Sequence, residues 1–210
     1  MKVLLVTDIH NDDEAARSAY AVEKPDFVLD CGDHVRIQNL FEFTPHLYIE
    51  GNHEPRIITA TSESMPLPTK ILPAKMYELT KDGQNLRVGG LDGNYSSANE
   101  SNLSVDKFSL DKLRMFHPFS LDVLLLHESP FNVNSTDSRT MKLAEEVREE
   151  IDRIRPKFVF SGHTGLYSVM KTPEKVNLVT LDDMHKGYGL LTLSNGEFNF
   201  ERKQAFYGQK

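Results

Sequence analysis

Cysteine is almost absent from the sequence: Cys31 is the only one among 210 residues. A single cysteine excludes any disulfide within the chain and is typical of a reducing compartment, so we expect a cytoplasmic protein. Cys31 ends an apolar segment, and we expect it to be a small buried hydrophobic residue.

Long apolar runs are absent as well. No segment approaches the roughly 18 apolar residues of a membrane-spanning helix, and Lys2 leads directly into a predicted strand rather than into the apolar core of a signal peptide. We therefore expect neither secretion nor membrane insertion.

An excess of basic residues is the third feature that the sequence lacks. The formal net charge is −7, with 26% charged residues, whereas proteins that bind nucleic acid usually present a basic face. Nucleic acid is therefore a disfavoured partner, although a small basic patch stays compatible with this charge. The sequence has no internal repeat, and its length suits one sizeable domain over residues 1–210.

What the sequence does contain is a set of apolar runs that each end in polar residues. Three of them lie near the N-terminus: VLLVTDIH at 3–10, FVLDCGD at 27–33 and HLYIEGNH at 46–53. Continuous apolar runs are typical of buried parallel strands. A helix from Asp12 or Asp13 to Glu23 would join the first two strands in a βαβ unit.

The second half of the chain repeats this order. Strands are predicted at Leu121–Leu126 and Lys157–Phe160, with a helix at Met141–Arg155 between them. Two hairpins are predicted around Asp82-Gly83 and Asn195-Gly196, so we expect an α/β fold. The loops expected to determine substrate selectivity are Pro55–Pro73, Asp92–Asn102 and Asn132–Arg139.

Polar side chains stand at the ends of five of the apolar runs. They are Asp8, His10, Asp33, Asn52, His53, His127 and His163. Each one alone is explained as a helix cap, a turn former or a hydrogen-bonded histidine. In an open α/β sheet, however, the strand ends meet at one edge where ligands bind, so their joint placement predicts a functional site.

This mixture of side chains suits a pair of metal ions. Two divalent ions about 3.5–4 Å apart can share a nucleophilic water and clamp a phosphoryl group. Such a pair needs an anionic bridge, and the carboxylate of Asp33, central among the strands, is the natural one. Imidazole, carboxylate and amide donors favour Mn, Fe, Zn, Co or Ni over Mg, and we expect Mn before the others.

Five short motifs resemble those of the calcineurin-like metallophosphoesterases in order and spacing. They are D-I-H at Asp8–His10, G-D-H at Gly32–His34, G-N-H-E at Gly51–Glu54, H-E at His127–Glu128 and G-H-T-G at Gly162–Gly165. The resemblance covers nearly the whole chain. It implies a two-sheet αββα sandwich, in a single domain, with a dinuclear metal site at the strand ends.

The resemblance also implies a role for each residue. The implied ligands are Asp8, His10 and Asp33 for one ion, and Asp33, Asn52, His127 and His163 for the other. His53 would not bind metal; it would lie over the phosphate and protonate the leaving oxygen. Catalysis would then depend on His53 and on the bridging Asp33.

One position departs from the family pattern. The family usually has G-H-x-H where this chain has Gly162–Gly165, so Gly165 stands in place of a histidine ligand. Either the first ion is held more weakly and completed by water or a distant group, or the protein has drifted toward binding without turnover. His185, with Asp182 and Asp183, is the candidate substitute, although a solvated turn before the final hairpin is the simpler interpretation.

We therefore expect a metal-dependent phosphoesterase that hydrolyses a phosphomonoester or a phosphodiester with a metal-bound hydroxide. The alternative is a non-catalytic or weakly catalytic scaffold or ligand-sensing module on the same fold. A nuclease is a further enzymatic alternative, weakened by the acidic charge. The expected partner is a small phosphoester rather than nucleic acid or a membrane, and the sequence leaves the natural ester and a homo-oligomer open.

Overall fold

A computed structural model of the protein describes residues 1–34, 40–41, 44–52, 68–95, 105, 107–133 and 135–205. Within these ranges, the strands form two mixed sheets of six strands each. None of the helices in the described part of the chain is long and apolar enough to cross a membrane.

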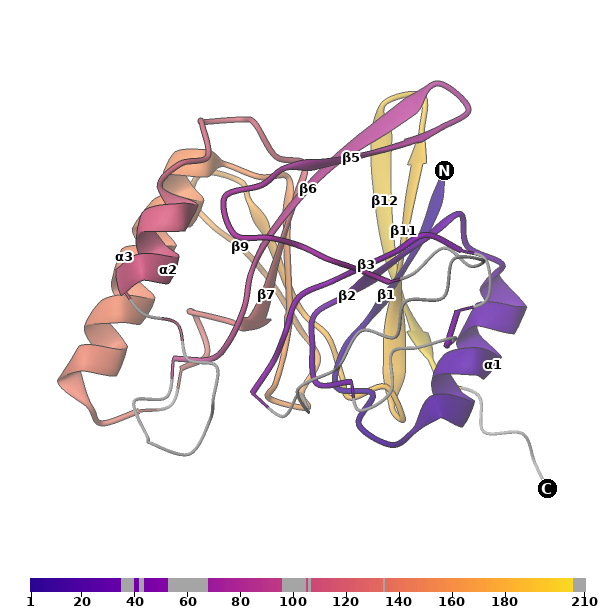
Figure 1. Ribbon diagram of the computed structural model, residues 1–210, viewed down its shortest axis with the longest axis horizontal. Helices are drawn as coiled ribbons and strands as arrows, with labels where there is room; N and C mark the ends of the chain where they lie inside the picture. The colour runs from indigo at the N-terminus through magenta and orange to yellow at the C-terminus, as the bar shows by residue number, and fades with distance from the viewer. Residues whose placement is uncertain are drawn as a thin grey trace.

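The first sheet has the strand order β12-β11-β1-β2-β3-β4 (Figure 1). Strands β1 to β4 run parallel, and β11 and β12 extend the sheet as an antiparallel hairpin next to β1. Their bounds are β1 Lys2–Val6, β2 Phe27–Asp30, β3 His46–Tyr48, β4 Thr69–Lys70, β11 Gly187–Ser194 and β12 Glu197–Gln204.

The second sheet has the order β5-β6-β7-β8-β10-β9. Strands β6, β7, β8 and β10 run parallel, while β5 and β9 are antiparallel edges. Their bounds are β5 Tyr77–Lys81, β6 Gln84–Leu91, β7 Val123–Glu128, β8 Phe158–Gly162, β9 Ser168–Lys171 and β10 Asn177–Thr180.

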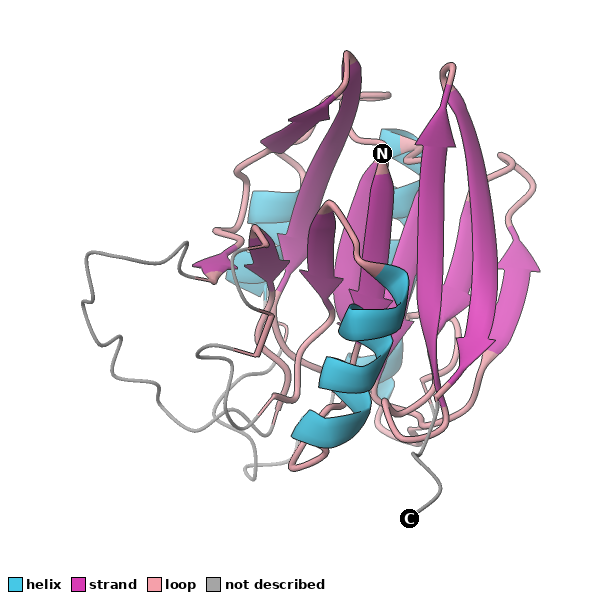
Figure 2. Ribbon diagram, turned by 90° about the vertical axis from the view of Figure 1, so that its right-hand side faces the viewer, coloured by secondary structure: helices cyan, strands magenta, loops and turns pink. Residues whose placement is uncertain are grey.

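Helices cover the outer face of each sheet (Figures 1 and 2). Helix α1 (Asp13–Glu23) packs on the first sheet, and α2 (Lys107–Leu113) and α3 (Ser138–Ile154) pack on the second. Both α1 and α3 begin at an aspartate N-cap, Asp12 and Asp137, whose carboxylate accepts backbone N–H groups of the first turn.

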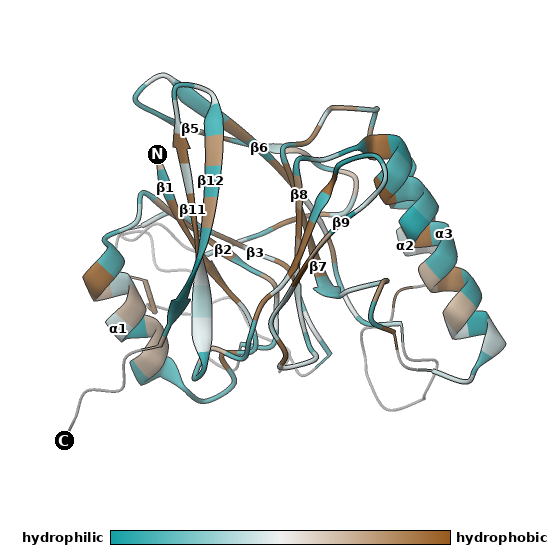
Figure 3. Ribbon diagram, turned by 180° about the vertical axis from the view of Figure 1, so that it is seen from behind, coloured by the Kyte–Doolittle hydropathy of each residue, from teal (hydrophilic) through white to brown (hydrophobic). Residues whose placement is uncertain are grey.

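The alternation of side chains along the strands explains the layers. In β1, Val3 and Leu5 point into the core between the sheets, while Leu4 and Val6 pack under α1. Strand β7 is likewise apolar on both faces, and Figure 3 shows hydrophobic residues concentrated along these central strands. The molecule is therefore a single α/β domain, and the predicted two-sheet αββα sandwich is confirmed.

Two strands were missing from the sequence prediction. Strand β9 has exposed apolar side chains, Val169 at 54% and Met170 at 48% accessibility, so it lacks the pattern of a buried strand. Strand β4 has only two residues and falls at the end of a segment predicted as loop. The predicted loops Pro55–Pro73 and Asp92–Asn102 lie for the most part outside the described residues.

Asp122 connects β6, β7 and β8 of the second sheet. It lies at the ends of these strands that are opposite to the predicted site residues. Its carboxylate accepts hydrogen bonds from Arg87 N and Nε, both at 3.0 Å, and lies 3.0 Å from Lys157 Nζ. Burial alone would raise the pKa of Asp122, but the bonds from Arg87 and the charge of Lys157 outweigh it and hold this pKa below its ordinary range.

We expect Asp122→Asn to lower the free energy of unfolding at pH 7 by about 1–3 kcal/mol, since it removes charge-assisted hydrogen bonds. Because the folded pKa is depressed, the stabilisation is fully present above the unfolded pKa of about 3.9 and is lost as the pH falls through the folded pKa. Urea unfolding of parent and variant at pH 7 and pH 3 measures this. An equal difference at both pH values would contradict it.

Candidate metal centre

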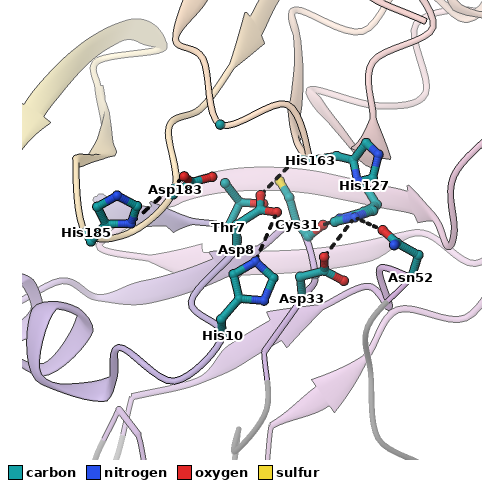
Figure 4. A network of polar contacts seen from close by, with 12 residues as sticks. Thr7, Asp8, His10, Cys31, Asp33, Asn52, His127, His163, Asp183 and His185 are labelled. Atoms are coloured by element: carbon teal, nitrogen blue, oxygen red, sulfur yellow. Dashed lines mark hydrogen bonds and ion pairs between the residues drawn. The ribbon is translucent and has the colours of Figure 1, made fainter. Parts of the chain in front are cut away.

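Parallel strands of both sheets end at one edge of the molecule, where the predicted site residues gather (Figure 4). Asp8 and His10 follow β1, Asp33 follows β2, and Asn52 follows β3. From the second sheet, His127 lies within the end of β7, and His163 follows β8.

Backbone hydrogen bonds hold the loops after β1 and β2 against each other. Asp8 N donates to Gly32 O at 2.9 Å, and His10 N donates to Asp33 O at 2.8 Å. The parallel pairing of β1 and β2 thus continues past the strands as far as a bridge between His10 and His34. The positions of Asp8, His10 and Asp33 are therefore set by the sheet itself.

Four of these residues have an unusual backbone conformation. The φ angles are +48° at Asp8, +49° at His10, +61° at Asp33 and +69° at His163. Side-chain-bearing residues avoid this left-handed region, and each such position costs about 1–3 kcal/mol. Other residues of the chain, such as the helix C-caps Lys24 and Arg155, also have positive φ, so the angles at the site support a functional role only together with the grouped side chains.

Asp8 is buried, with 4% of its surface accessible. Its Oδ2 atom accepts hydrogen bonds from Thr7 Oγ1 at 2.7 Å and from the backbone N–H of His163 at 2.8 Å. Burial nevertheless raises the pKa of Asp8 above its ordinary value. Thr7 was not predicted as a partner, and its position next to Asp8 is the only signal in the sequence that could have indicated it.

His127 is oriented by two opposite contacts. Its Nδ1 atom donates to the carbonyl oxygen of Cys31 at 2.8 Å, so Nε2 points into the site. There it lies 2.9 Å from Asn52 Oδ1 and 3.4 Å from Asp33 Oδ2. Burial opposes the charged imidazolium, but the hydrogen bond and charge of Asp33 prevail and raise the pKa of His127 to about 9.

The side chains form two overlapping groups. Within each group, the ligand atoms all lie within 4.8 Å of one another. One group is Asp8, His10 and Asp33, and the other is Asp33, His127 and His163. Asn52 joins the second group through its contact with His127. Asp33 belongs to both groups, which is the arrangement that a bridging carboxylate requires.

Glycines let the backbone come close to these side chains. A Cβ atom on Gly51 would overlap Asp33 Oδ1 and lie 2.7 Å from His127 Cε1, and one on Gly162 would overlap Thr7 Oγ1 and Asp8 Oδ2. Any larger residue at either position would push the carboxylates out of place.

A buried polar cluster supports the turn that carries Asp33. The Oδ1 atom of Asp30 accepts the N–H of Gly32 at 2.9 Å, and its Oδ2 atom lies 3.2 Å from His34 Nδ1 and 3.4 Å from His46 Nε2. Although burial opposes ionisation, the two histidines hold the pKa of Asp30 well below its usual range. His34, the last residue of the G-D-H motif, thus contacts Asp30 in the interior.

Of the two remaining sequence predictions, the structure describes only Cys31. Cys31 is fully buried and unpaired, as predicted, and burial raises the pKa of its thiol well above the ordinary value. His53, the predicted general acid, lies outside the described residues.

The candidate substitutes for a ligand at Gly165 differ in their surroundings. Asp182 is bound to Arg202 Nε at 2.6 Å. Asp183 accepts a hydrogen bond from Lys186 Nζ at 2.8 Å, and His185, with 47% of its side chain accessible, has Nδ1 3.9 Å from Asp183 Oδ2.

The family model of the calcineurin-like phosphoesterase superfamily domain matches residues 1–204. The chain belongs to the calcineurin-like phosphoesterases. The resemblance to this family seen in the sequence is thus confirmed. None of the curated proteins matches the chain.

Several solved structures share the fold of this calcineurin-like phosphoesterase. The GAP50 anchor of the inner membrane complex of Plasmodium is 12% identical, with a TM-score of 0.66, over 100% of this chain and 86% of the other. A dimetal phosphatase from Danio rerio is 10% identical, with a TM-score of 0.62, over 97% and 96%. The phosphopantetheinyl hydrolase of Mycobacterium tuberculosis is 12% identical, with a TM-score of 0.55, over 87% and 90%. At such identities the likeness shows the fold alone.

We expect Gly51→Ala to fold but to bind divalent metal at least about tenfold more weakly, because the added methyl group displaces Asp33 and His127. Calorimetric titration with Mn²⁺ measures the affinity, and circular dichroism checks the fold. Gly83→Ala is the control: a Cβ atom there has nothing within 4 Å, and although its φ of +73° strains the turn between β5 and β6, metal affinity should not change. Equal metal affinity in both variants would show that the close approach at Gly51 is unimportant.

Proposed function

We propose that this protein is a metal-dependent phosphoesterase that acts at a dinuclear site. The observation that carries the proposal is that Asp33 belongs to both groups of ligand side chains. A carboxylate with two oxygens can serve two ions about 3.5–4 Å apart, which is the spacing that two-metal phosphoryl chemistry uses.

The donors of the site fit divalent transition metals. Asp8, His10 and Asp33 would hold one ion, and Asp33, Asn52, His127 and His163 the other. The bond from His127 Nδ1 to the Cys31 carbonyl supports this assignment, because metal-bound histidines usually donate their second N–H to such an acceptor. Nitrogen donors beside carboxylates favour Mn, Fe, Zn, Co or Ni over Mg, and we propose Mn.

Two bound ions would supply a nucleophilic water at neutral pH and positive charge beside the phosphoryl oxygens. The chain's own contribution is to fix the donors. Thr7 and the N–H of His163 orient the carboxylate of Asp8, and the Cys31 carbonyl orients His127. Since these supports are buried and hydrogen-bonded, little reorganisation should accompany the reaction.

His53 is proposed as the general acid. It follows Asn52 directly in the chain, and an imidazole can carry a proton to a leaving oxygen near neutral pH. The proposed substrate is a small phosphoester, because a chain of net charge −7 does not favour a polyanion. The single unpaired Cys31 supports a reducing, cytoplasmic setting, and self-association is left open.

A non-catalytic scaffold is the competing function. The anchor from Plasmodium has a similar fold, so the fold alone does not separate the two functions. We favour the enzyme, because two buried carboxylates and three histidines, grouped as ligands for two ions, are more than a surface that only docks a partner requires.

A panel of phosphomonoesters and phosphodiesters assayed with Mn, Zn, Co and Ni tests the proposal. We expect Asp33→Asn to lose both ions and nearly all turnover, while Asp8→Asn loses chiefly one ion, since Asp33 alone is shared. Asp122→Asn, which removes a carboxylate remote from the site, should keep the metal. Metal binding without turnover on any ester would favour the scaffold, and equal, mild metal loss in both site variants would contradict the bridge.

We expect His53→Ala to keep both ions and to lose about 10²–10⁴ in rate, the usual contribution of a general acid. The loss should be smaller for a nitrophenyl ester, whose leaving group needs no proton. Rates on alkyl and nitrophenyl esters, with metal content measured in parallel, decide this. If the variant loses its metal, His53 is a ligand and not the acid.

A further inference from the structure

The two ligand groups are unequal. Among the described residues, His127 and His163 stand with Asp33 on one side and have Asn52 as an additional donor, while the other side has only Asp8 and His10 besides the shared Asp33. Transition metals take at least four ligands, so the Asp8 side has room for a further protein donor.

The turn after β10 offers three candidates, of which two have unsuitable surroundings. Asp182 is a buried partner of Arg202, at 2.6 Å, and that contact holds it in place. His185 is exposed, and Figure 4 shows it on the far side of Asp183 from Asp8. Asp183 remains, and Figure 4 shows its carboxylate between His185 and Asp8.

The position of Asp183 depends on Gly165. A Cβ atom at Gly165 would lie 2.8 Å from Asp183 Oδ1 and 2.9 Å from Oδ2, so the carboxylate occupies the space that a side chain at 165 would enter. Gly165 is two residues beyond His163, whose N–H donates to Asp8 Oδ2. The loop therefore connects the Asp8 carboxylate with that of Asp183, which lies outside the 4.8 Å group of Asp8, His10 and Asp33 and would reach an ion by turning Oδ1 toward that group.

Lys186 binds one oxygen of this carboxylate and leaves the other oxygen available to a cation. Its Nζ atom donates to Asp183 Oδ2 at 2.8 Å and to the carbonyl oxygen of Gly165 at 2.9 Å. The backbone N–H of Lys186 also donates to Asp183 O at 2.8 Å. The turn is thus tied to the loop that carries His163, and Oδ1 of Asp183 keeps its lone pairs for another cation.

We infer that Asp183 is a metal ligand on the Asp8 side of the site, completing the set of Asp8, His10 and Asp33. This inference rests on the proposed dinuclear function. Gly165 then matters because it has no side chain, which leaves space for the Asp183 carboxylate from the turn after β10. Lys186 holds the carboxylate and offsets the charge of a third acidic side chain at this side of the site.

Titration with Mn²⁺ alone tests the inference, with bound ions counted by calorimetry and free ions by electron paramagnetic resonance. The parent should bind two ions. Asp183→Ala should keep one ion at the parent affinity and bind the other about 10- to 100-fold more weakly, or beyond detection. His185→Ala should bind both as the parent does.

Lys186→Met is the matched control, because it breaks the same ion pair but retains the carboxylate. It should keep both ions, whereas a merely structural ion pair predicts equal metal loss in Lys186→Met and Asp183→Ala. Thermal unfolding without metal checks that every variant is folded.

The inference is wrong if Asp183→Ala binds both ions as the parent does, if Lys186→Met loses as much metal as Asp183→Ala, or if only His185→Ala loses an ion. In these cases a parent that still binds two ions leaves the proposed function intact. A parent that binds no Mn²⁺ would instead contradict the proposed function itself.

Discussion

Two buried carboxylates at the shared edge of two sheets impose the main constraint on this protein. Asp8 and Asp33 have 4% and 1% of their surface accessible, and each raises the cost of ionising the other. Buried negative charge has to be balanced by a cation or a proton. The raised pKa of His127 follows from this requirement, because the charges of Asp33 and Asp8 both favour its imidazolium form. Divalent ions would meet the same demand more fully.

The sheets provide the rigidity that this arrangement needs. Left-handed backbone at Asp8, Asp33 and His163 is unfavourable, and it persists because β1, β2 and β8 are buried on both faces and paired on both sides. Polar interactions hold both ends of the strands: the Asp30 cluster supports the turn of Asp33, and the bonds of Asp122 lie at the opposite strand ends. Only the first set borders the site, so substitutions at the two ends should have different effects on metal binding.

Much of this could be predicted from sequence because it depends on local pattern. Apolar runs locate β1, β2 and β7, and the rule that parallel strands end at one edge brings Asp8, Asp33 and His127 together. Side-chain packing between distant segments could not be predicted. The contact of Asp183 with Gly165 and the cluster of Asp30 with two histidines depend on which strand ends become neighbours, and an apolar pattern carries no such information.

The same fold occurs in an anchor and in a dimetal phosphatase, so architecture leaves the function undecided. Charge and strain give a physical criterion instead. Buried carboxylates and left-handed backbone positions are costly, and the proposed metal site gives them a use. The carboxylates stand beside Gly51 and Gly162, which leave room for no larger residue, and the proposed metal site would account for this close packing. In the inferred site Asp183 would supply a carboxylate where the family pattern has an imidazole, and Lys186, which is hydrogen-bonded to it, would offset the added charge.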